Sequence, residues 1–587
     1  MIRDDFQHDR SPGTVVGSAA ADGSVRGGVD AEGSLAVDNG ALRIGFLEQP
    51  GWGREAVSYG PLPVRSGLAM SALVLNGHNA SELHDPPVYG LFAGRWHRLK
   101  RRLLASQRPP QLPENLAVGW SEGPGNRAER PRGPLFFVRQ QHDGENATLC
   151  ARVGDALAPV LPRLRDLPYL YVVVLRPEGA VYYAAAGIEG TPGLPMLPSM
   201  RPLAVDPTPP PAELAASVEQ SVIAESGWRI DSRVQAVRVD EAPELVAAAA
   251  GPGPAGLVCG RLAAVGSGLR WRGGEDGDGF ALALGAEGVT LTATVDGAAS
   301  ELAREHGVGP GVFAQVRDDG EELGVLLDGA QAFGGPLLDR RLGDRAGAAA
   351  LGAVSAFEAH PRELPVPAGL LAPAPWDQRG TELLFCDRFE GPAGELGEPW
   401  VKREGKGRVL LDGAGGARVD ATRESPNPGR LIYTRPWERP EFAEIAVDQT
   451  PAGEAEGEGE GGRVGLVFMQ DPGNYLIVNV WVDDAYPGTS ISSFLMLDGE
   501  EDHYRAVWCN VGRTIRWGVR SRLAIAFDGM RWTARVDGVP VLHRSIRDVY
   551  PRTPRLALTE VGFTANWEWG DDTGSLLHEF NGWGRDR

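Results

Sequence analysis

Short β-rich runs separated by turn residues restrict the fold of this chain more than any other feature. Each run has about five to nine residues and is bounded by Gly, Pro, Asp or Asn, which is typical of strands. The chain holds 79 Gly and 46 Pro among 587 residues, too many helix breakers for an all-α protein. Convincing helix signals are scarce, and the alanine-rich residues 241–250 are a candidate. We therefore predict an all-β fold with antiparallel strands, with the clearest examples at 41–47, 71–77, 168–175, 180–187, 280–285, 289–297, 465–470, 475–483 and 523–529.

Asp-Gly pairs recur at a fixed spacing within this pattern. In the middle of the chain, Asp319-Gly320 is followed nine residues later by Asp328-Gly329. Near the end, Asp528-Gly529 is followed nine residues later by Asp537-Gly538. Asp and Gly accept the positive φ that tight hairpin turns need. The repeated spacing predicts a duplicated unit built from two successive hairpins.

Proline-rich stretches divide the chain into three parts. At roughly 150 residues per domain, 587 residues correspond to about three or four domains. The stretches 200–213 and 361–376 are typical of extended connectors. We therefore expect domains at 1–212, 213–376 and 377–587, and we expect the first to contain a long basic, Pro-rich loop over 100–134.

The hairpin pattern resembles the LamG-like members of the concanavalin A-like lectin/glucanase superfamily. The run from Cys386 to Gly391, followed by Trp400, is similar to the opening of such a domain. The segment GLVFMQDPGNYLIVNV, with its turn at 471–474, is similar to the central hairpin, and GLRWRGGEDGDGFALAL takes its place in the middle segment. The resemblance implies tandem jelly-roll β-sandwiches and carbohydrate recognition. It identifies no ligand, because this fold also carries hydrolases, lyases and adhesion modules.

Strand alternation in the last segment indicates a polar face opposite the core. Along 475–483 and 561–569, every second residue is apolar, and the residues between include aromatic, amide and acidic side chains. Such groups suit a sugar, whose hydroxyls need amides and carboxylates and whose apolar ring face stacks on an aromatic ring. The alternative is a solvated outer face. The predicted ligand-binding residues are Tyr475, Asn479, Trp481 and Asn566.

Two carboxylates are the predicted catalytic pair if the protein is an enzyme. Glycoside hydrolysis usually requires two carboxyl groups. Asp483 and Glu568 fit this role, with Glu444 and Asp448 on a third strand in reserve. The single-strand acid motif E-x-D-x-x-E of the glucanases with this fold is absent, and EIAVD at 444–448 has a different spacing.

The sequence thus predicts a multi-domain, lectin-like protein that binds polysaccharide or oligosaccharide, with a link to polysaccharide metabolism. Two alternatives stay open. One is a glycoside hydrolase or polysaccharide lyase, and the other is a non-catalytic assembly protein whose sandwiches are interaction surfaces.

Metal and cofactor signals are few. We expect no cofactor other than structural calcium, for which Asp571 and Asp572 supply the oxygen ligands that a hard cation prefers. The chain has four cysteines, all more than 100 residues apart and without a C-x-x-C pair, so their spacing gives no support for a zinc site. We expect them to be small buried residues or free thiols, namely Cys150, Cys259, Cys386 and Cys509.

The charge of the chain argues against two classes of partner. A net charge of −20 disfavours nucleic acid and anionic membrane surfaces. No apolar run approaches the ~18 residues of a membrane span. The start of the sequence shows no signal peptide, so we expect a cytoplasmic location, with non-classical export left open. The oligomeric state is not indicated.

Overall fold

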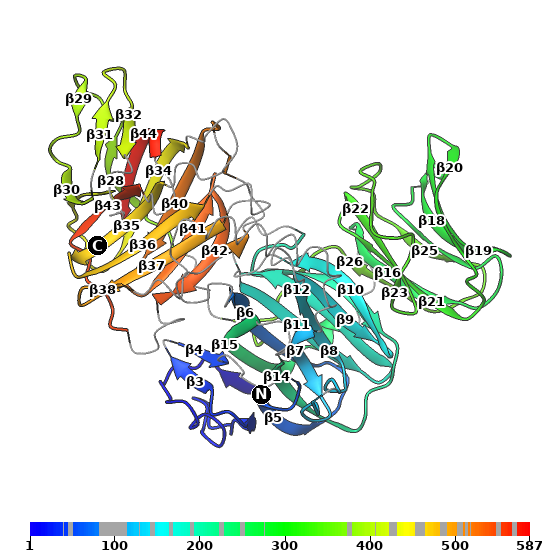
Figure 1. Cartoon of the computed structure of the whole chain (residues 1–587). Coiled ribbons are helices and arrows are strands. Elements are labelled where there is room, and N and C mark those ends of the chain that lie inside the picture. The colour runs from blue at the N-terminus through cyan, green and yellow to red at the C-terminus, as the bar shows by residue number, and fades with distance from the viewer. Residues whose placement is uncertain are drawn as a thin grey trace, which may run out of the picture.

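The structure is a computed structural model of the whole chain. It describes residues 1–38, 40–44, 51–81, 114–127, 129–140, 147–163, 168–187, 193–221, 228–246, 253–274, 276–372, 378–405, 407–421, 431–451, 464–481, 490–501, 509–510, 515–516, 518–546, 553–565 and 572–586. In these segments the regular elements are β-strands, apart from a short 3₁₀ turn at Pro243–Leu245. The strands form six antiparallel sheets, which pair into three sandwiches (Figure 1). The predicted all-β fold of tandem sandwiches is therefore confirmed.

The first sandwich consists of sheets 1 and 2, with a large apolar core between them. In order across sheet 1 are β27 (Leu364–Pro365), β13 (Ser199–Asp206), β12 (Gly179–Ala186), β11 (Pro168–Arg176), β6 (Leu68–Ser81), β15 (Trp228–Glu241), β4 (Ala41–Ile44) and β3 (Leu35–Asp38), with β1 (Ile2–Asp4) beside β15. In order across sheet 2 are β10 (Ala156–Arg163), β9 (Ala147–Val153), β8 (Leu135–Gln140), β7 (Glu114–Ser121), β14 (Glu213–Gln220), β5 (Glu55–Pro63) and β2 (Gly27–Asp30).

The second sandwich consists of sheets 3 and 4 and is the smallest. Sheet 3 runs β23 (Ala330–Gln331), β22 (Glu322–Leu327), β21 (Val312–Asp318), β16 (Ala255–Leu262) and β26 (Val354–Pro361), with β24 (Leu337–Leu338) beside β22. Sheet 4 runs β20 (Ala298–His306), β19 (Gly288–Val295), β18 (Gly279–Leu284), β17 (Gly268–Trp271) and β25 (Ala348–Leu351).

The third sandwich consists of sheets 5 and 6. Sheet 5 runs β29 (Gly394–Glu395), β31 (Arg408–Leu411), β32 (Ala417–Ala421), β44 (Asp572–Gly584), β34 (Ala443–Thr450), β40 (Ser521–Phe527), β41 (Arg531–Val536) and β42 (Val539–Ser545), with β28 (Glu382–Asp387) beside β44. Sheet 6 runs β30 (Val401–Glu404), β33 (Leu431–Pro436), β43 (Glu560–Ala565), β35 (Val464–Asp471), β36 (Asn474–Trp481), β37 (Ser490–Leu497) and β38 (Glu500–Glu501), with β39 (Cys509–Asn510) beside β37.

The repeated Asp-Gly pairs lie at equivalent hairpins, as predicted. One pair joins β21 to β22 and the other joins β40 to β41. The second pair of each repeat has both residues at positive φ, 47° and 79° at Asp328-Gly329 and 50° and 81° at Asp537-Gly538. Asp328 accepts a hydrogen bond from the Phe313 amide, and Asp537 accepts one from the Arg522 amide, each at 2.9 Å. The second and third sandwiches therefore share one hairpin design.

The predicted boundary after residue 212 falls inside the first sandwich. Strand β14 pairs with β5 and β7, and β15 pairs with β4 and β6, so both complete the first sandwich. The first half of the Pro-rich stretch 200–213 belongs to the strand β13, which ends at Asp206 and tolerates Pro202 near the edge of sheet 1. Clusters of proline are thus a poor guide to domain limits in an all-β chain.

Two other local predictions are corrected. The helix expected at 241–250 is absent from its described part, because β15 extends to Glu241 and Pro243 opens only a 3₁₀ turn. The loop expected over 100–134 contains β7, all of whose residues are buried. β7 lies inside sheet 2 with both faces covered, so it lacks the alternation that would reveal it.

The first and second sandwiches share an apolar interface, the joint between sheets 1 and 3. It buries Leu170 and Val172 of β11 against Leu257 and Phe313 of sheet 3. The residues that follow β27 pack on the same face of sheet 1, with Val366 and Leu370 buried in this cluster. Sheet 1 is therefore covered on both faces, and the joint makes the two sandwiches one body (Figure 1).

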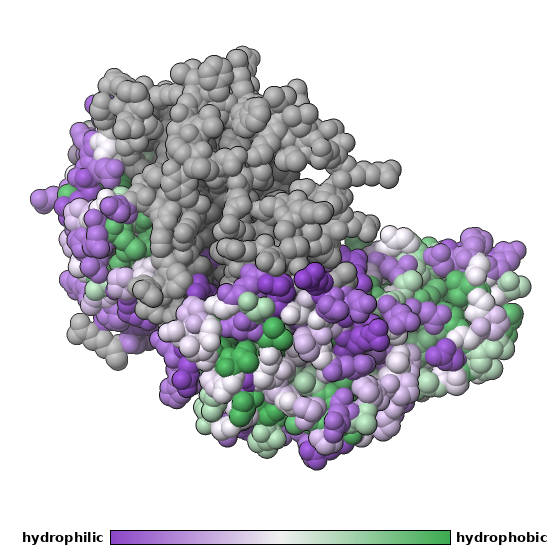
Figure 2. Space-filling model, turned by 60° about the horizontal axis from the view of Figure 1, so that its bottom comes forward, coloured by the Kyte–Doolittle hydropathy of each residue, from purple (hydrophilic) through white to green (hydrophobic). Residues whose placement is uncertain are grey.

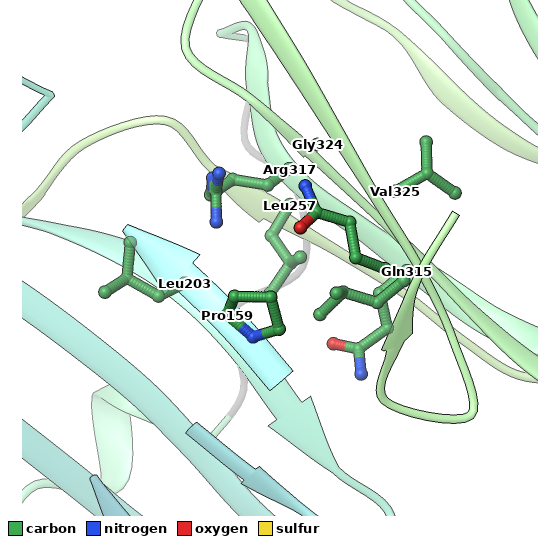
Figure 3. Close-up of a pocket in the computed structure, with 9 residues that line it drawn as sticks. Pro159, Leu203, Leu257, Gln315, Arg317, Gly324 and Val325 are labelled. Atoms are coloured by element: carbon green, nitrogen blue, oxygen red, sulfur yellow. The ribbon is translucent and has the colours of Figure 1, made fainter. Parts of the chain in front are cut away.

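Polar side chains complete the joint. The Val205 amide donates to Oε1 of Gln315 at 2.7 Å, and Nε2 of Gln315 donates to the Val205 carbonyl at 2.9 Å. Figure 3 shows Gln315 and Arg317 of β21 facing Pro159 and Leu203 of the first sandwich. The hollow between them measures about 10 Å³, about one water molecule. The joint is a closed contact rather than a ligand pocket.

The surface gives no large apolar patch in the part that the structure describes. Exposed large apolar side chains are scattered over different elements, and Figure 2 shows hydrophobic residues in small groups among hydrophilic ones. No helix among the described residues has the length and apolar character needed to cross a bilayer.

Candidate functional site

The outer face of sheet 6 carries Tyr475 and Asn479, two of the residues that the sequence predicted to contact a ligand. On β36, Leu476 and Val478 point into the core of the third sandwich. Tyr475, Ile477 and Asn479 therefore lie on the opposite face. The predicted alternation of β36 is confirmed for its described residues.

Thr564, Gly465 and Asn479 form a row across this face, which we call the polar row. Thr564 of β43 is the direct partner of Gly465 on β35. A Cβ built on Gly465 would lie 2.2 Å from Oδ1 of Asn479, so the amide crosses directly over the glycine. It would also lie 2.6 Å from the Val478 carbonyl, so any side chain at 465 would collide with the backbone. Glycine at this position lets Asn479 lie across its neighbouring strand.

The polar groups of the row are buried and lack hydrogen bonds. Asn479 and Thr564 are both 0% exposed. Neither Oδ1 nor Nδ2 of Asn479 has a hydrogen-bond partner, and Oγ1 of Thr564 has none. Burying such groups unpaired costs about 1–3 kcal/mol each. The row therefore holds one amide donor, one amide acceptor and one hydroxyl whose bonding capacity is unused.

A charged network occupies the other end of the face. Nε of Arg403 donates to Glu560 at 2.9 Å and to Thr434 at 3.2 Å, and Thr434 also donates to Glu560. The Tyr475 hydroxyl donates to Glu404 at 3.3 Å. The carboxylate of Glu560 is therefore already paired with the guanidinium of Arg403.

Tyr475 takes a different position from the one predicted for stacking on a sugar. Its ring is 2% exposed and belongs to an apolar cluster on the outer face. The ring is therefore closed to a ligand in this structure, and only its hydroxyl reaches the charged end. The other buried members of the cluster are Ile432, Val467, Met469 and Ile477.

The reserve acids Glu444 and Asp448 do not share the face with β36 and β43. They lie on β34 of sheet 5, and the outer faces of two stacked sheets point in opposite directions. Glu444 accepts from the Gly380 amide at 2.6 Å. Asp448 pairs with Arg520 at 2.9 Å and Arg522 at 2.8 Å. The reserve acids on β34 therefore cannot join a site built on the outer face of sheet 6.

Several predicted residues lie outside the described residues. Trp481 and Asp572 are placed on β36 and β44, but their side chains are not described. The roles proposed for them stay predictions. The positions wholly outside are Asp483, Asn566, Glu568 and Asp571.

Gly465 is the site residue that sequence reasoning missed. It is the second residue of β35, and a glycine near the start of a strand is usually interpreted as marking the strand boundary. Its pairing with Thr564 and its closeness to Asn479 depend on the register of three strands, which local pattern does not give. The only local signal for this site in the sequence is a glycine at an outward-facing position, next to a strand that carries an asparagine.

No protein-family model and no curated protein matches this sequence. Solved structures similar in fold include a β-1,3-glucanase from Mycobacterium marinum, with 14% identity and a TM-score of 0.26, over 35% of this chain and 100% of the glucanase. An immunostimulatory antigen and pseudo β-1,3-glucanase of Mycobacterium tuberculosis is similar at 17% identity and a TM-score of 0.27, over 35% of this chain and 100% of its own. The galectin LEC-6 of Caenorhabditis elegans is similar at 12% identity and a TM-score of 0.19, over 25% of this chain and 88% of its own.

Proposed function

We propose that this protein is a carbohydrate-binding, lectin-like protein whose third sandwich contacts an oligosaccharide or polysaccharide at the polar row. The observation that carries the proposal is the buried Asn479 amide, which has no hydrogen bond on either atom. Neighbouring sugar hydroxyls, each both donor and acceptor, can satisfy an amide oxygen and an amide NH₂ together. The hydroxyl of Thr564 offers a third contact at the same place. The sequence resemblance to lectin-like domains points in the same direction.

Access to the row requires a local opening. Both polar side chains are buried, so a sugar reaches them only after neighbouring groups move aside. Binding that requires such a change is slower than docking to a preformed face. We therefore expect association rates below the typical ~10⁵–10⁷ M⁻¹s⁻¹ range of protein complexes.

A glycan-array screen followed by calorimetric titration tests the proposal. We expect the wild-type chain to bind at least one oligosaccharide. Asn479→Leu should weaken that binding about tenfold or more, equivalent to about 1.4 kcal/mol, and Thr564→Val should weaken it less. The matched control is Thr533→Val, because Thr533 is equally buried but lies on sheet 5. Failure to bind any glycan, or equal affinity in Asn479→Leu and the control, would exclude the polar row as the site.

The enzyme hypothesis requires a separate assay. The proposed catalytic pair remains Asp483 and Glu568, and the substrate would be a polysaccharide. Release of reducing sugar reports hydrolysis, and absorbance of unsaturated uronate reports a lyase reaction. Turnover that survives in both Asp483→Asn and Glu568→Gln would remove this pair. A link to polysaccharide metabolism and a cytoplasmic location are part of the proposal, and cell fractionation tests the location.

The joint between the first and second sandwiches gives no support to the assembly hypothesis. The outer face of sheet 1 and the facing side of sheet 3 are already used for contact within the chain. Because they are covered, these faces are open neither to a partner protein nor to a sugar. The proposal for carbohydrate therefore concerns the third sandwich alone.

A further inference from the structure

Three side chains with metal-binding chemistry converge on the face of sheet 3 that contacts sheet 1. Cys259 of β16 lies directly opposite Glu358 of β26, and His360 follows two residues later on the same face. One ligand atom from each lies within 4.8 Å of the others. Within the described residues, this is the only group of three or more such side chains with so close an approach.

We propose that Cys259, His360 and Glu358 bind one divalent transition-metal ion, with zinc as the expected metal. Thiolate, imidazole and carboxylate are the three ligand types of protein zinc sites. With bonds of about 2.0–2.3 Å, tetrahedral ligand atoms lie roughly 3.2–3.8 Å apart. Ligand atoms within 4.8 Å therefore need only small rotations of their side chains. The paired strands β16 and β26 hold the Cα positions fixed while these rotations occur.

The hydrogen bonding around His360 fits a ligand role. Its Nε2 lies 3.0 Å from Oε2 of Glu358, a distance close to that between two ligands of one metal. Its Nδ1 is buried and has no hydrogen-bond partner. When a metal ion binds Nε2, the proton that Nε2 shares with Glu358 moves to Nδ1, and the imidazole stays neutral. The thiol of Cys259 loses its proton to solvent on binding, because the thiolate is the ligand.

The charges near the site balance with a divalent ion in place. The ion, the thiolate and the carboxylate of Glu358 sum to zero. Arg176 of the first sandwich contacts Glu358 through Nη1 at 2.6 Å, and its Nε lies 3.6 Å from Glu178. Glu178 offsets the charge of Arg176. Arg176 and His360 both contact Oε2 of Glu358, so the carboxyl group must rotate slightly to keep Arg176 on one oxygen and bind metal with the other.

Exposure indicates where the ion would enter. Cys259 and His360 are buried, whereas the side chain of Glu358 is 23% exposed. The fourth ligand is therefore a water molecule on the side of Glu358. The spacing of the cysteines gave no sign of such a site, because its ligands stand on two strands 99 residues apart at Cys259 and Glu358 and meet only through strand pairing.

Cobalt titration of the full-length, chelator-treated protein tests the site. Co²⁺ reports tetrahedral coordination through visible d–d bands and reports a thiolate ligand through near-ultraviolet charge transfer. We expect saturation at about one equivalent and displacement by Zn²⁺. Cys259→Ser should abolish the charge-transfer band, and His360→Gln should weaken affinity about tenfold or more. Cys150→Ser is the matched control, since Cys150 is equally buried but lies in the first sandwich, and it should retain the full spectrum.

Two results would overturn the site. One is the absence of these bands in the wild type at a several-fold excess of Co²⁺, together with no bound zinc by elemental analysis. The other is a charge-transfer band that persists in Cys259→Ser. If Cys259→Ser does not fold, His360→Gln and Glu358→Gln decide the matter through the affinity, and unchanged affinity in both excludes the site.

Discussion

The outer faces of sheets 1 and 6 both contain buried polar groups, but the hydrogen bonding of these groups differs. On sheet 1, facing the second sandwich, Gln315 satisfies both polar atoms of Val205, and Arg176 pairs with Glu358. On sheet 6, the amide of Asn479 and the hydroxyl of Thr564 have no partner. The contacts of Gln315 and Arg176 satisfy buried polar groups at the joint, because unpaired buried groups cost stability, although Nδ1 of His360 has no partner there. A face that leaves them open has unused bonding capacity, which the proposed sugar site would use.

Removal of Arg176 should give the largest effect on the joint. The guanidinium is 3% exposed and pairs with Glu358, so Arg176→Met leaves a partly buried carboxylate without its cation. Loss of one partner of a buried pair costs about 3–5 kcal/mol. We expect a fall of about 3 kcal/mol in the free energy of unfolding of the first two sandwiches, measured by urea denaturation with metal chelated.

The control for Arg176 is an exposed pair in the second sandwich. Arg304 lies 2.7 Å from Glu301, with side chains 36% and 47% exposed. Arg304→Met should destabilise far less than Arg176→Met, because water screens such pairs. Equal losses in the two variants would show that the joint is not held by its buried charges.

Acid should weaken the joint through the same carboxylate. Burial alone raises the pKa of Glu358, but hydrogen bonds from His360 and Arg176 outweigh it and lower the pKa to about 2. A carboxyl whose pKa is lower in the folded state stabilises above its ordinary pKa of 4.5 and loses that contribution as pH falls toward 2. The difference corresponds to a contribution on the order of 3 kcal/mol.

The acid effect is isolated by comparing two proteins, since other carboxyls titrate in the same range. The difference in unfolding free energy between wild type and Glu358→Gln should shrink as pH falls from 4.5 toward 2. A difference that stays constant over this window would contradict the assigned role of Glu358 in the joint.

The sequence predicted the sandwiches well because their signals are local. Residues adjacent in the sequence determine the strand alternation around Leu476 and Val478. They also determine the positive φ of Asp328 and Asp537 in their turns. It predicted the joint and the polar row poorly because these depend on register between distant strands. Gln315 meets Val205 across 110 residues, and no periodicity encodes that contact. The first domain boundary failed for the same reason, since β14 and β15 join strands far earlier in the chain.

Gln315→Leu should have the next largest effect. The side chain fits apolar surroundings, but the variant removes two hydrogen bonds of 2.7 and 2.9 Å and leaves both polar atoms of Val205 unpaired. Each such loss costs about 1 kcal/mol, so we expect about 2 kcal/mol of destabilisation by urea denaturation. A loss below about 0.5 kcal/mol would mean that water replaces the amide at the joint.

Asn479→Leu should have the smallest effect and the opposite sign. Leucine is close to asparagine in shape, and the variant removes an amide that is buried without a partner. Replacing an unpaired buried polar group with an apolar one relieves its desolvation cost, so the third sandwich should gain up to about 1 kcal/mol in the same urea experiment. Gln315→Leu and Asn479→Leu make the same kind of change, and only the hydrogen bonding of the replaced amide differs. If Asn479→Leu destabilises as much as Gln315→Leu, then the amide of Asn479 is bonded within the protein in solution and is not held ready for a sugar.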